Sequence, residues 1–461
     1  MLTSRLFAPE QKEKPFGSHA EYADYLFACV DVRLEAYIAG MKPLLLNEGG
    51  GYRNVLYPDI ETAHDLCQKR LTDFSATLAA CSPPASGPAG AGPDAETEDL
   101  FAALAGEGAP GTPPGTPPIG EMLAYVESRA QVTDHAAVPL PIHTLSRKLG
   151  LTPFSLFCFA AALLSATQTN YAVIFQIVGQ NASLTAPSLE SAARVYRGPE
   201  FSLTAAAGDM SLALEQLAPL LDMNVNKTMP FSTVLSPDKR MLDFLFGASP
   251  LRLDEKYNRF FSLLTDGEEL DPLLAGESQL DALRIAFAGG TRVFSLYGDE
   301  GSGRRFTIRH FCAERRLNCV GLDCGKLFAY DFAFVEKALW ALARECVLTD
   351  ACCCLAHLGY REEEKEKFFG YMDLALSKLT ENKLTVFTSS QEKLPLKEIT
   401  RLDFAQFELP APSGLEREEL WRYYARPYEF ESDVDLVEMA AKFLFTPGKI
   451  KNALKMGRSL A

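Results

Sequence analysis

The chain has 461 residues, 47% apolar residues and a net charge of −15 at pH 7. This length predicts two to four soluble globular domains, and the negative charge argues against a broad electrostatic grip on nucleic acid or an anionic membrane. The N-terminus lacks an apolar signal segment, and no apolar run is long enough to span a membrane. Eleven cysteines occur in no paired spacing, which indicates reduced thiols and a cytoplasmic protein.

The N-terminal half of the chain divides into four segments by composition and periodicity. Residues 1–80 carry apolar side chains at helical spacing and are predicted to be helical. Residues 81–120 are rich in proline, glycine and alanine without a periodic apolar face, which predicts a flexible linker. Residues 121–235 resume a helical pattern, and residues 236–275 are interpreted as a connecting segment with short helices.

Within the second helical region, the run LSRKLGLTPFSLFCFAAALL predicts two helices joined by a short turn. Gly150 suits the left-handed C-cap of the first helix, and Thr152 followed by Pro153 suits the start of the second. The second helix is apolar nearly throughout and has no basic residues at its start. It is therefore interpreted as a core helix and not as a DNA-recognition helix.

From residue 276 to residue 410 the pattern becomes α/β. Apolar strands alternate with amphipathic helices, which predicts a parallel, doubly wound sheet with a buried interior. Residues 411–461 follow as three helical segments. The expected fold class is thus an α/β parallel sheet with a C-terminal helical lid, preceded by mostly helical N-terminal domains.

A glycine-rich stretch lies between the first predicted strand of the sheet and the following helix. In this context a phosphate-binding P-loop reads G-x-x-x-x-G-K-[ST]; its backbone N–H groups surround phosphate oxygens, and the next helix directs its N-terminal dipole at the charge. Gly298 and Gly303 match the two glycine positions, so the sheet is predicted to be a P-loop sheet. The candidate nucleotide-binding residues are Gly298, Asp299, Glu300, Gly301, Ser302, Gly303, Arg304 and Arg305.

The residues that would support ATP hydrolysis are replaced. Arg304 stands at the lysine position, and Arg305 stands at the Ser/Thr position that would ligate Mg²⁺. After the third strand, Ala356 and His357 stand where an aspartate and a glutamate are expected, so no carboxylate organises a metal shell. ATP or ADP is therefore expected to bind weakly at most, and Mg²⁺ is not expected.

Several cysteines and a histidine follow the glycine-rich stretch without the paired spacing that a zinc site requires. They fall on a predicted helix and strand that face the core, where buried cysteine is the ordinary finding. No metal site is predicted among His310, Cys312, Cys319 and Cys324.

The C-terminal motifs resemble the AAA+ ATPase family, over about residues 275–461. The matched segments are GDEGSGRR, ACCCLAH, LTVFTSS, FELPAPSGLEREELW and FLFTPGKIKNAL. The resemblance implies sensor roles for Ser389 or Ser390 at the end of the fourth strand, for Arg401 before the fifth strand, and for Lys449 at the start of a lid helix. A strand-terminating serine pair and two surface cations explain the same residues equally well.

The helical region before the sheet is similar to the variant winged-helix region of long bacterial ATP-binding proteins, some of which are encoded with contractile injection systems. The segments that carry this similarity are LSRKLGLTPFSLFCFAAALL and NYAVIFQIVGQNASLTAPSLESAARVY. In those proteins, this region and a degenerate ATPase-like module precede a second, intact AAA+ module. The chain is expected to be either the N-terminal half of such a protein or a stand-alone pseudo-ATPase.

The expected function is that of a catalytically degenerate AAA+ module, which acts as a regulatory or assembly platform of a larger ATP-binding protein or complex. Protein partners are expected, including an intact AAA+ module in cis or in trans, and a homo-oligomer is compatible with the resemblance. Membrane and nucleic-acid partners are not expected. Two alternatives stay open: an active ATPase in which Arg304 and Ser390 are essential, and a scaffold that binds proteins and no nucleotide.

Overall fold

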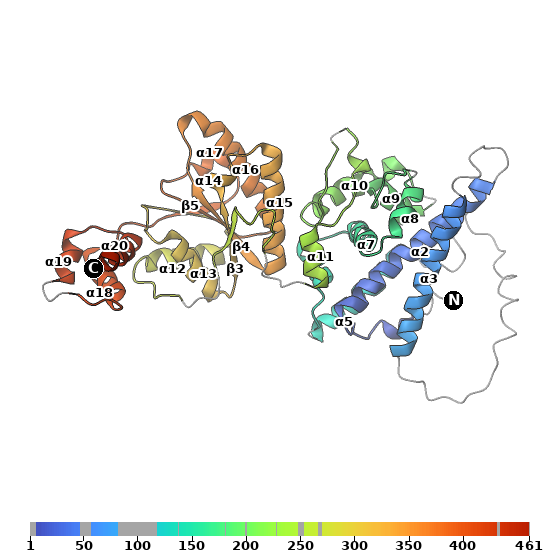
Figure 1. The fold of residues 1–461 in the computed structure, drawn as a ribbon, viewed down its shortest axis with the longest axis horizontal. Helices are drawn as coiled ribbons and strands as arrows, with labels where there is room; N and C mark the ends of the chain where they lie inside the picture. The colour runs from blue at the N-terminus through green and yellow to red at the C-terminus, as the bar shows by residue number, and fades with distance from the viewer. Residues whose placement is uncertain are drawn as a thin grey trace. The chain divides into compact units, whose positions relative to one another are not determined.

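The protein folds as two compact units, Met1–Ala248 and Ser249–Ala461, in a computed structural model (Figure 1). The linker predicted for residues 81–120 falls almost entirely outside the described residues. No helix in the described part of the chain is long and apolar enough to cross a membrane. The structure describes residues 6–46, 57–81, 118–136, 138–179, 181–198, 201–226, 228–247, 253–265, 270–430 and 434–460.

The first unit is built from helices. Its core helix is α7 (Pro153–Thr167), which is buried along most of its length and contacts α2, α9 and α10. Between residues 118 and 247, the described residues form only isolated β-bridges and no strand, so the winged-helix similarity stays a prediction. The other elements of this unit are η1 (Pro9–Gln11), α2 (His19–Leu46), α3 (Tyr57–Cys81), α5 (Ile119–His135), α6 (Pro141–Leu149), α8 (Tyr171–Val178), α9 (Leu189–Arg197), α10 (Leu203–Leu217), η3 (Pro230–Ser232) and α11 (Lys239–Phe246).

The turn between α6 and α7 confirms the capping residues predicted from the sequence. Gly150 is the C-cap of α6 and adopts the left-handed conformation, with φ of 64°. The Thr152 side chain accepts a hydrogen bond from the backbone N–H of Ser155, and Pro153 opens α7. The buried, apolar character of α7 agrees with its interpretation as a core helix.

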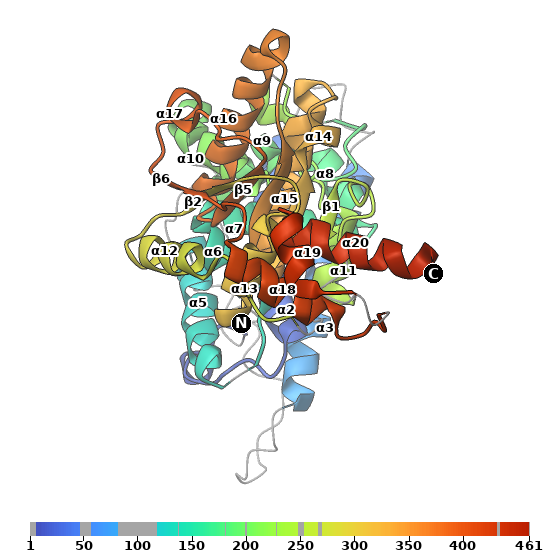
Figure 2. The same ribbon diagram turned by 90° about the vertical axis from the view of Figure 1, so that its left-hand side faces the viewer.

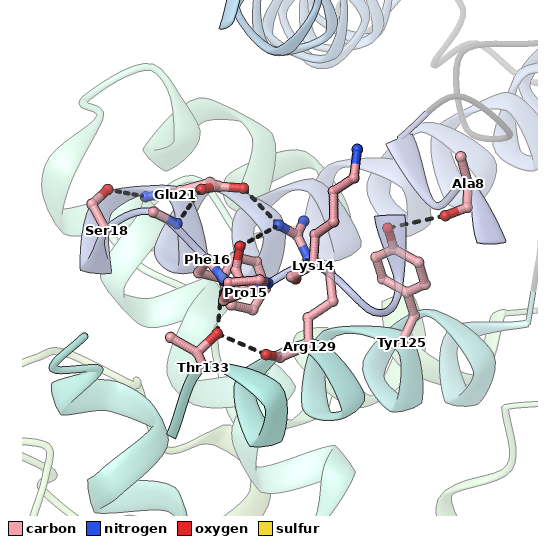
Figure 3. Close-up of polar contacts among 10 residues, drawn as sticks. Ala8, Lys14, Pro15, Phe16, Ser18, Glu21, Tyr125, Arg129 and Thr133 are labelled. Atoms are coloured by element: carbon pink, nitrogen blue, oxygen red, sulfur yellow. Dashed lines mark hydrogen bonds and ion pairs between the residues drawn. The ribbon is translucent and has the colours of Figure 1, made fainter. Parts of the chain in front are cut away.

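The segment that precedes α2 is fastened to α5 by one buried arginine (Figure 3). The Arg129 Nε donates to the Lys14 carbonyl over 3.0 Å, and its Nη2 donates to a Glu21 carboxylate oxygen over 2.9 Å. Its guanidinium also lies 4.1 Å from the centre of the Phe16 ring. The backbone N–H of Phe16 donates to the Thr133 hydroxyl over 2.8 Å, which adds a second attachment.

The second unit contains a six-stranded sheet in the order β1-β3-β4-β5-β2-β6. All neighbouring strands are parallel except β1, which runs antiparallel to β3. The predicted α/β class with a mainly parallel sheet is confirmed. The strands are β1 (Phe261–Leu263), β2 (Val293–Tyr297), β3 (Asn318–Asp323), β4 (Ala351–Leu358), β5 (Val386–Ser390) and β6 (Phe404–Glu408).

Residues 236–275, interpreted from the sequence as a connecting segment with short helices, contain the short helix α11 and also strand β1. This strand pairs Phe261 with Leu322 and Leu263 with Val320, and so extends the sheet beyond β3. Three residues are too few to show the alternation by which a strand is recognised in a sequence. The pairing with β3, rather than any local pattern, makes this segment a strand.

Helices cover both faces of the sheet, with α12 and α13 on one face and α15 and α16 on the other (Figure 1). Helices α18, α19 and α20 have a small core of their own around Trp421 and Ile450, and they face the viewer in Figure 2. The helices of this unit are α12 (Glu277–Ala288), α13 (Arg304–Glu314), α14 (Cys324–Leu327), α15 (Phe332–Thr349), η4 (Glu362–Glu364), α16 (Lys365–Glu381), α17 (Leu396–Ile399), α18 (Gly414–Ala425), α19 (Leu436–Lys442) and α20 (Pro447–Leu460).

Candidate functional site

A cavity of about 860 Å³ opens where the carboxyl ends of β2, β4 and β5 meet. Ligands of parallel α/β sheets bind at this edge, and the volume lies within the roughly 300–1,000 Å³ typical of small-molecule sites. Its walls come from residues 301–306 of the glycine-rich loop and the start of α13, from the segments after β4 and β5, and from the start of α20, whereas Gly298, Asp299 and Glu300 do not line it.

The glycine-rich loop needs glycine at specific positions. Gly298, Gly301 and Gly303 all have positive φ, of 149°, 78° and 96°. A Cβ on Gly298 would collide with the Leu409 carbonyl, and one on Gly301 would lie 2.6 Å from the Thr446 hydroxyl. The loop is therefore held tightly between β6 and α20 and leaves its inner side open to the cavity.

The loop and the start of α13 contain hydrogen-bond donors without a side-chain partner among the described residues. Helix α13 begins at Arg304, its N-cap is Gly303, and no side chain caps its first N–H groups. The Ser302 hydroxyl is buried and has no hydrogen-bond partner among the described residues. Orphaned donors at a helix N-terminus fit an anion such as a phosphate group.

Arg304 does not take the position that a P-loop lysine would occupy. Its Nη1 donates to the backbone carbonyls of Gly298 and Ser390, so the side chain ties the loop to the end of β5. The pKa of Arg304 is lowered, first by burial and then by the neighbouring charge of Arg305. A bound anion would relieve this repulsion between adjacent cations.

The positions expected to organise Mg²⁺ contact each other directly. The Arg305 Nη2 lies 2.6 Å from Nε2 of His357. Because a guanidinium only donates, His357 accepts at Nε2 and carries its proton on Nδ1. The neighbouring Ala356 is buried in the core between the sheet and α13. A cation and an imidazole in contact, with no carboxylate at these positions, do not fit a Mg²⁺ shell.

The structure brings some of the predicted sensor residues to the cavity. Ser389 and Ser390 are buried, line it, and lie beside Leu296 and Tyr297 at the end of β2. Arg401 is exposed between α17 and β6 and does not line the cavity.

Lys449 lies in the first turn of α20, where its backbone nitrogen approaches Gly301. The lysine of this helix that lines the cavity is Lys451, whose Nζ lies 3.3 Å from the Asp271 carboxylate.

Sequence reasoning missed the residues that join α20 to the glycine-rich loop. The Thr446 hydroxyl donates to the Glu300 carbonyl over 2.8 Å, and the backbone N–H of Gly448 donates to the Gly301 carbonyl over 2.9 Å. The TPG turn marks the start of the helix in the sequence, but its contact with a loop almost 150 positions earlier has no local signal.

Comparison with known proteins adds little to this geometry. No family model matches the chain, and no curated protein matches it. Among solved structures, a chain from a structure titled "Structural Basis for Katanin Self-Assembly" aligns with a TM-score of 0.36 and 12% identity, covering 46% of this chain and 78% of that chain. A TM-score this low assigns neither a family nor a function to this protein.

Proposed function

We propose that residues 249–461 form a degenerate AAA+-type module that binds ATP or ADP weakly, without Mg²⁺, and does not hydrolyse it. The observation that carries this proposal is the contact between Arg305 and His357. Arg305 places a cation, and His357 a neutral ring, at the two positions that would organise a catalytic metal. Bound nucleotide would then act as a regulatory or structural ligand of a larger complex.

The donors around the cavity support an anionic ligand. The Ser302 hydroxyl, which has no partner in the described part of the chain, the uncapped start of α13 and the Arg305 guanidinium all belong to one loop and one helix turn. Together they supply neutral and charge-assisted hydrogen bonds to phosphate oxygens. If ATP or ADP binds here, its phosphates are the groups that these donors would recognise.

Asp323, the acidic residue that ends β3, does not restore a metal site. Asp323 accepts a hydrogen bond from the backbone N–H of Lys326, and its carboxylate pairs with the Lys326 ammonium at 2.9 Å. This carboxylate is thus occupied as the cap of α14. An active ATPase would have to draw its metal ligand from elsewhere, which disfavours that alternative.

A nucleotide-free scaffold is the second candidate function, and one observation favours it. Thr446 and Gly448 hydrogen-bond directly to the glycine-rich loop, so contacts within the protein dock α20 against it. In a scaffold, this closed arrangement would be the working state and the cavity would have no role.

Titration calorimetry with ATP and ADP distinguishes these functions. We expect Arg305→Ala to weaken nucleotide binding by about tenfold or more, because it removes a charge-assisted contact with phosphate. Arg316→Ala is the matched control, since it removes an exposed arginine just beyond the far end of α13. Binding that both variants leave unchanged would contradict the phosphate site, and no detectable binding by the unmodified chain would favour the scaffold.

A further inference from the structure

Three cysteine side chains converge inside the core beneath α13. Strands β3 and β4 place Cys319 directly opposite Cys352, and α13 contributes Cys312 from above that face of the sheet. All three sulfur atoms lie within 4.8 Å of one another, and the Cys312 and Cys352 sulfurs are 3.3 Å apart. All three side chains are buried.

The spacing of the sulfurs suits a three-coordinate metal. A metal–sulfur distance of roughly 2.3 Å in a planar trigonal site requires sulfurs about 4.0 Å apart. The Cys312–Cys352 separation of 3.3 Å is shorter than this value, and no two of the three sulfurs are more than 4.8 Å apart. Small side-chain rotations would therefore be enough to bring the three sulfurs into place.

The surroundings select the kind of metal. Among the described residues, this ligand group contains three thiols and neither a histidine nor a carboxylate, while Phe294, Phe311 and Phe387 belong to the same core cluster. Structural zinc sites use four ligands, whereas thiolates in a soft environment select Cu(I). We propose that Cys312, Cys319 and Cys352 form a three-thiol binding site for a soft monovalent metal ion, Cu(I).

Two residues that the sequence grouped with these cysteines lie elsewhere. His310 places Nε2 3.0 Å from the Asp271 carbonyl, and Cys324 lies on α14. The missing third ligand is Cys352, which sequence spacing cannot identify because only the pairing of β3 with β4 brings it to Cys319. The site therefore has no C-x-x-C signature.

Anaerobic titration of the reduced full chain with Cu(I), against a competing Cu(I) chelator, tests this site. We expect one tightly bound Cu(I) per chain, with three sulfur neighbours in X-ray absorption. Loading should be slow, because α13 must move to admit the ion. Cys352→Ala should weaken binding by more than the roughly 10–100-fold that loss of a residue supporting a metal ligand costs.

Cys324→Ala is the matched control, because it removes a buried cysteine of the same unit that is outside the group. It should leave Cu(I) affinity unchanged, and Cys312→Ala should repeat the loss seen with Cys352→Ala. Tryptophan fluorescence from Trp340 and Trp421 verifies that each variant folds. Equal affinity of the unmodified chain and Cys352→Ala, or a Cys312–Cys352 disulfide in protein purified under reducing conditions, would overturn the proposal.

Discussion

At the scale of single residues, Arg305 and His357 show how two replacements far apart in the chain act together. Each departs from the expected motif, and the structure joins them at 2.6 Å. Both positions could be identified from the sequence, because the expected ATPase motifs specify which residue types should occur there. It could not predict their contact, because His357 has a positive φ of 54° beside an irregularity in the pairing of β4 with β5.

A change of charge at residue 357 tests this contact. His357→Glu should weaken ATP binding by about fivefold or more, because the new carboxylate faces the phosphates and pairs with Arg305. His357→Gln keeps a neutral hydrogen-bond acceptor and should bind ATP as the unmodified chain does. Calorimetry on both variants checks this, and equal affinities for glutamate and glutamine would contradict the placement of the phosphates.

A buried carboxylate in the first unit gives a prediction on pH. Burial raises the pKa of Asp31 to about 6, against the opposing effect of Arg70, whose Nε lies 2.7 Å away. The folded state therefore holds a proton between about pH 4 and pH 6 that the unfolded state has released. The free energy of unfolding should decrease as pH rises through this window, by up to about 3 kcal/mol.

Urea unfolding followed by far-ultraviolet circular dichroism measures this pH dependence. Asp31→Asn cannot ionise, so the difference between its stability and that of the unmodified chain should change across the same window. A constant difference from about pH 4 to pH 6 would show that Asp31 does not keep its proton in the fold.

At the scale of elements, the meeting of α20 with the glycine-rich loop depends on a close backbone approach. Gly301 and Gly303 both have positive φ, but only at Gly301 would an added Cβ press against Thr446 and Gly448. The close packing of α20 against the loop thus requires glycine at residue 301. This requirement is separate from the one that the positive φ imposes.

These glycines form a matched pair of substitutions. Both Gly301→Ala and Gly303→Ala should cost about 1–2 kcal/mol from the left-handed backbone. Only Gly301→Ala should also displace α20 and change the fluorescence of Trp421, which packs in the same small core as Ile450. Identical spectra for the two variants would contradict the close approach.

The elements that sequence predicted best carry strong local patterns. Strand β4 contains the apolar run CCCL, and the α6–α7 turn has Gly150 and Thr152 at capping positions. Strand β1 was not predicted, because its three residues form a strand only through their pairing with the neighbouring β3. The convergence of Cys312, Cys319 and Cys352 was not predicted for the same reason, because the register between neighbouring strands brings these residues together.

At the scale of the whole molecule, the described residues that line the cavity all belong to the second unit. Every residue that lines the cavity lies between Asp271 and Lys451. Each unit has its own buried core.

Separate production of the two units tests this division. Each should unfold cooperatively, because a unit with its own core folds alone. Residues 249–461 should bind ATP with the affinity of the full chain. Both tryptophans, Trp340 and Trp421, lie in this unit, so their fluorescence reports its unfolding specifically. Loss of nucleotide binding in a folded second unit would assign part of the site to the first.

The most direct test of the central claim is ATP binding by the full chain with Mg²⁺ and with a chelator of divalent ions, together with measurement of phosphate release. Because Arg305 and His357 occupy the metal positions, we predict the same modest affinity in both conditions and no phosphate release above background. Affinity that rises with Mg²⁺, accompanied by steady phosphate release, would contradict a degenerate module and require a metal ligand outside these positions.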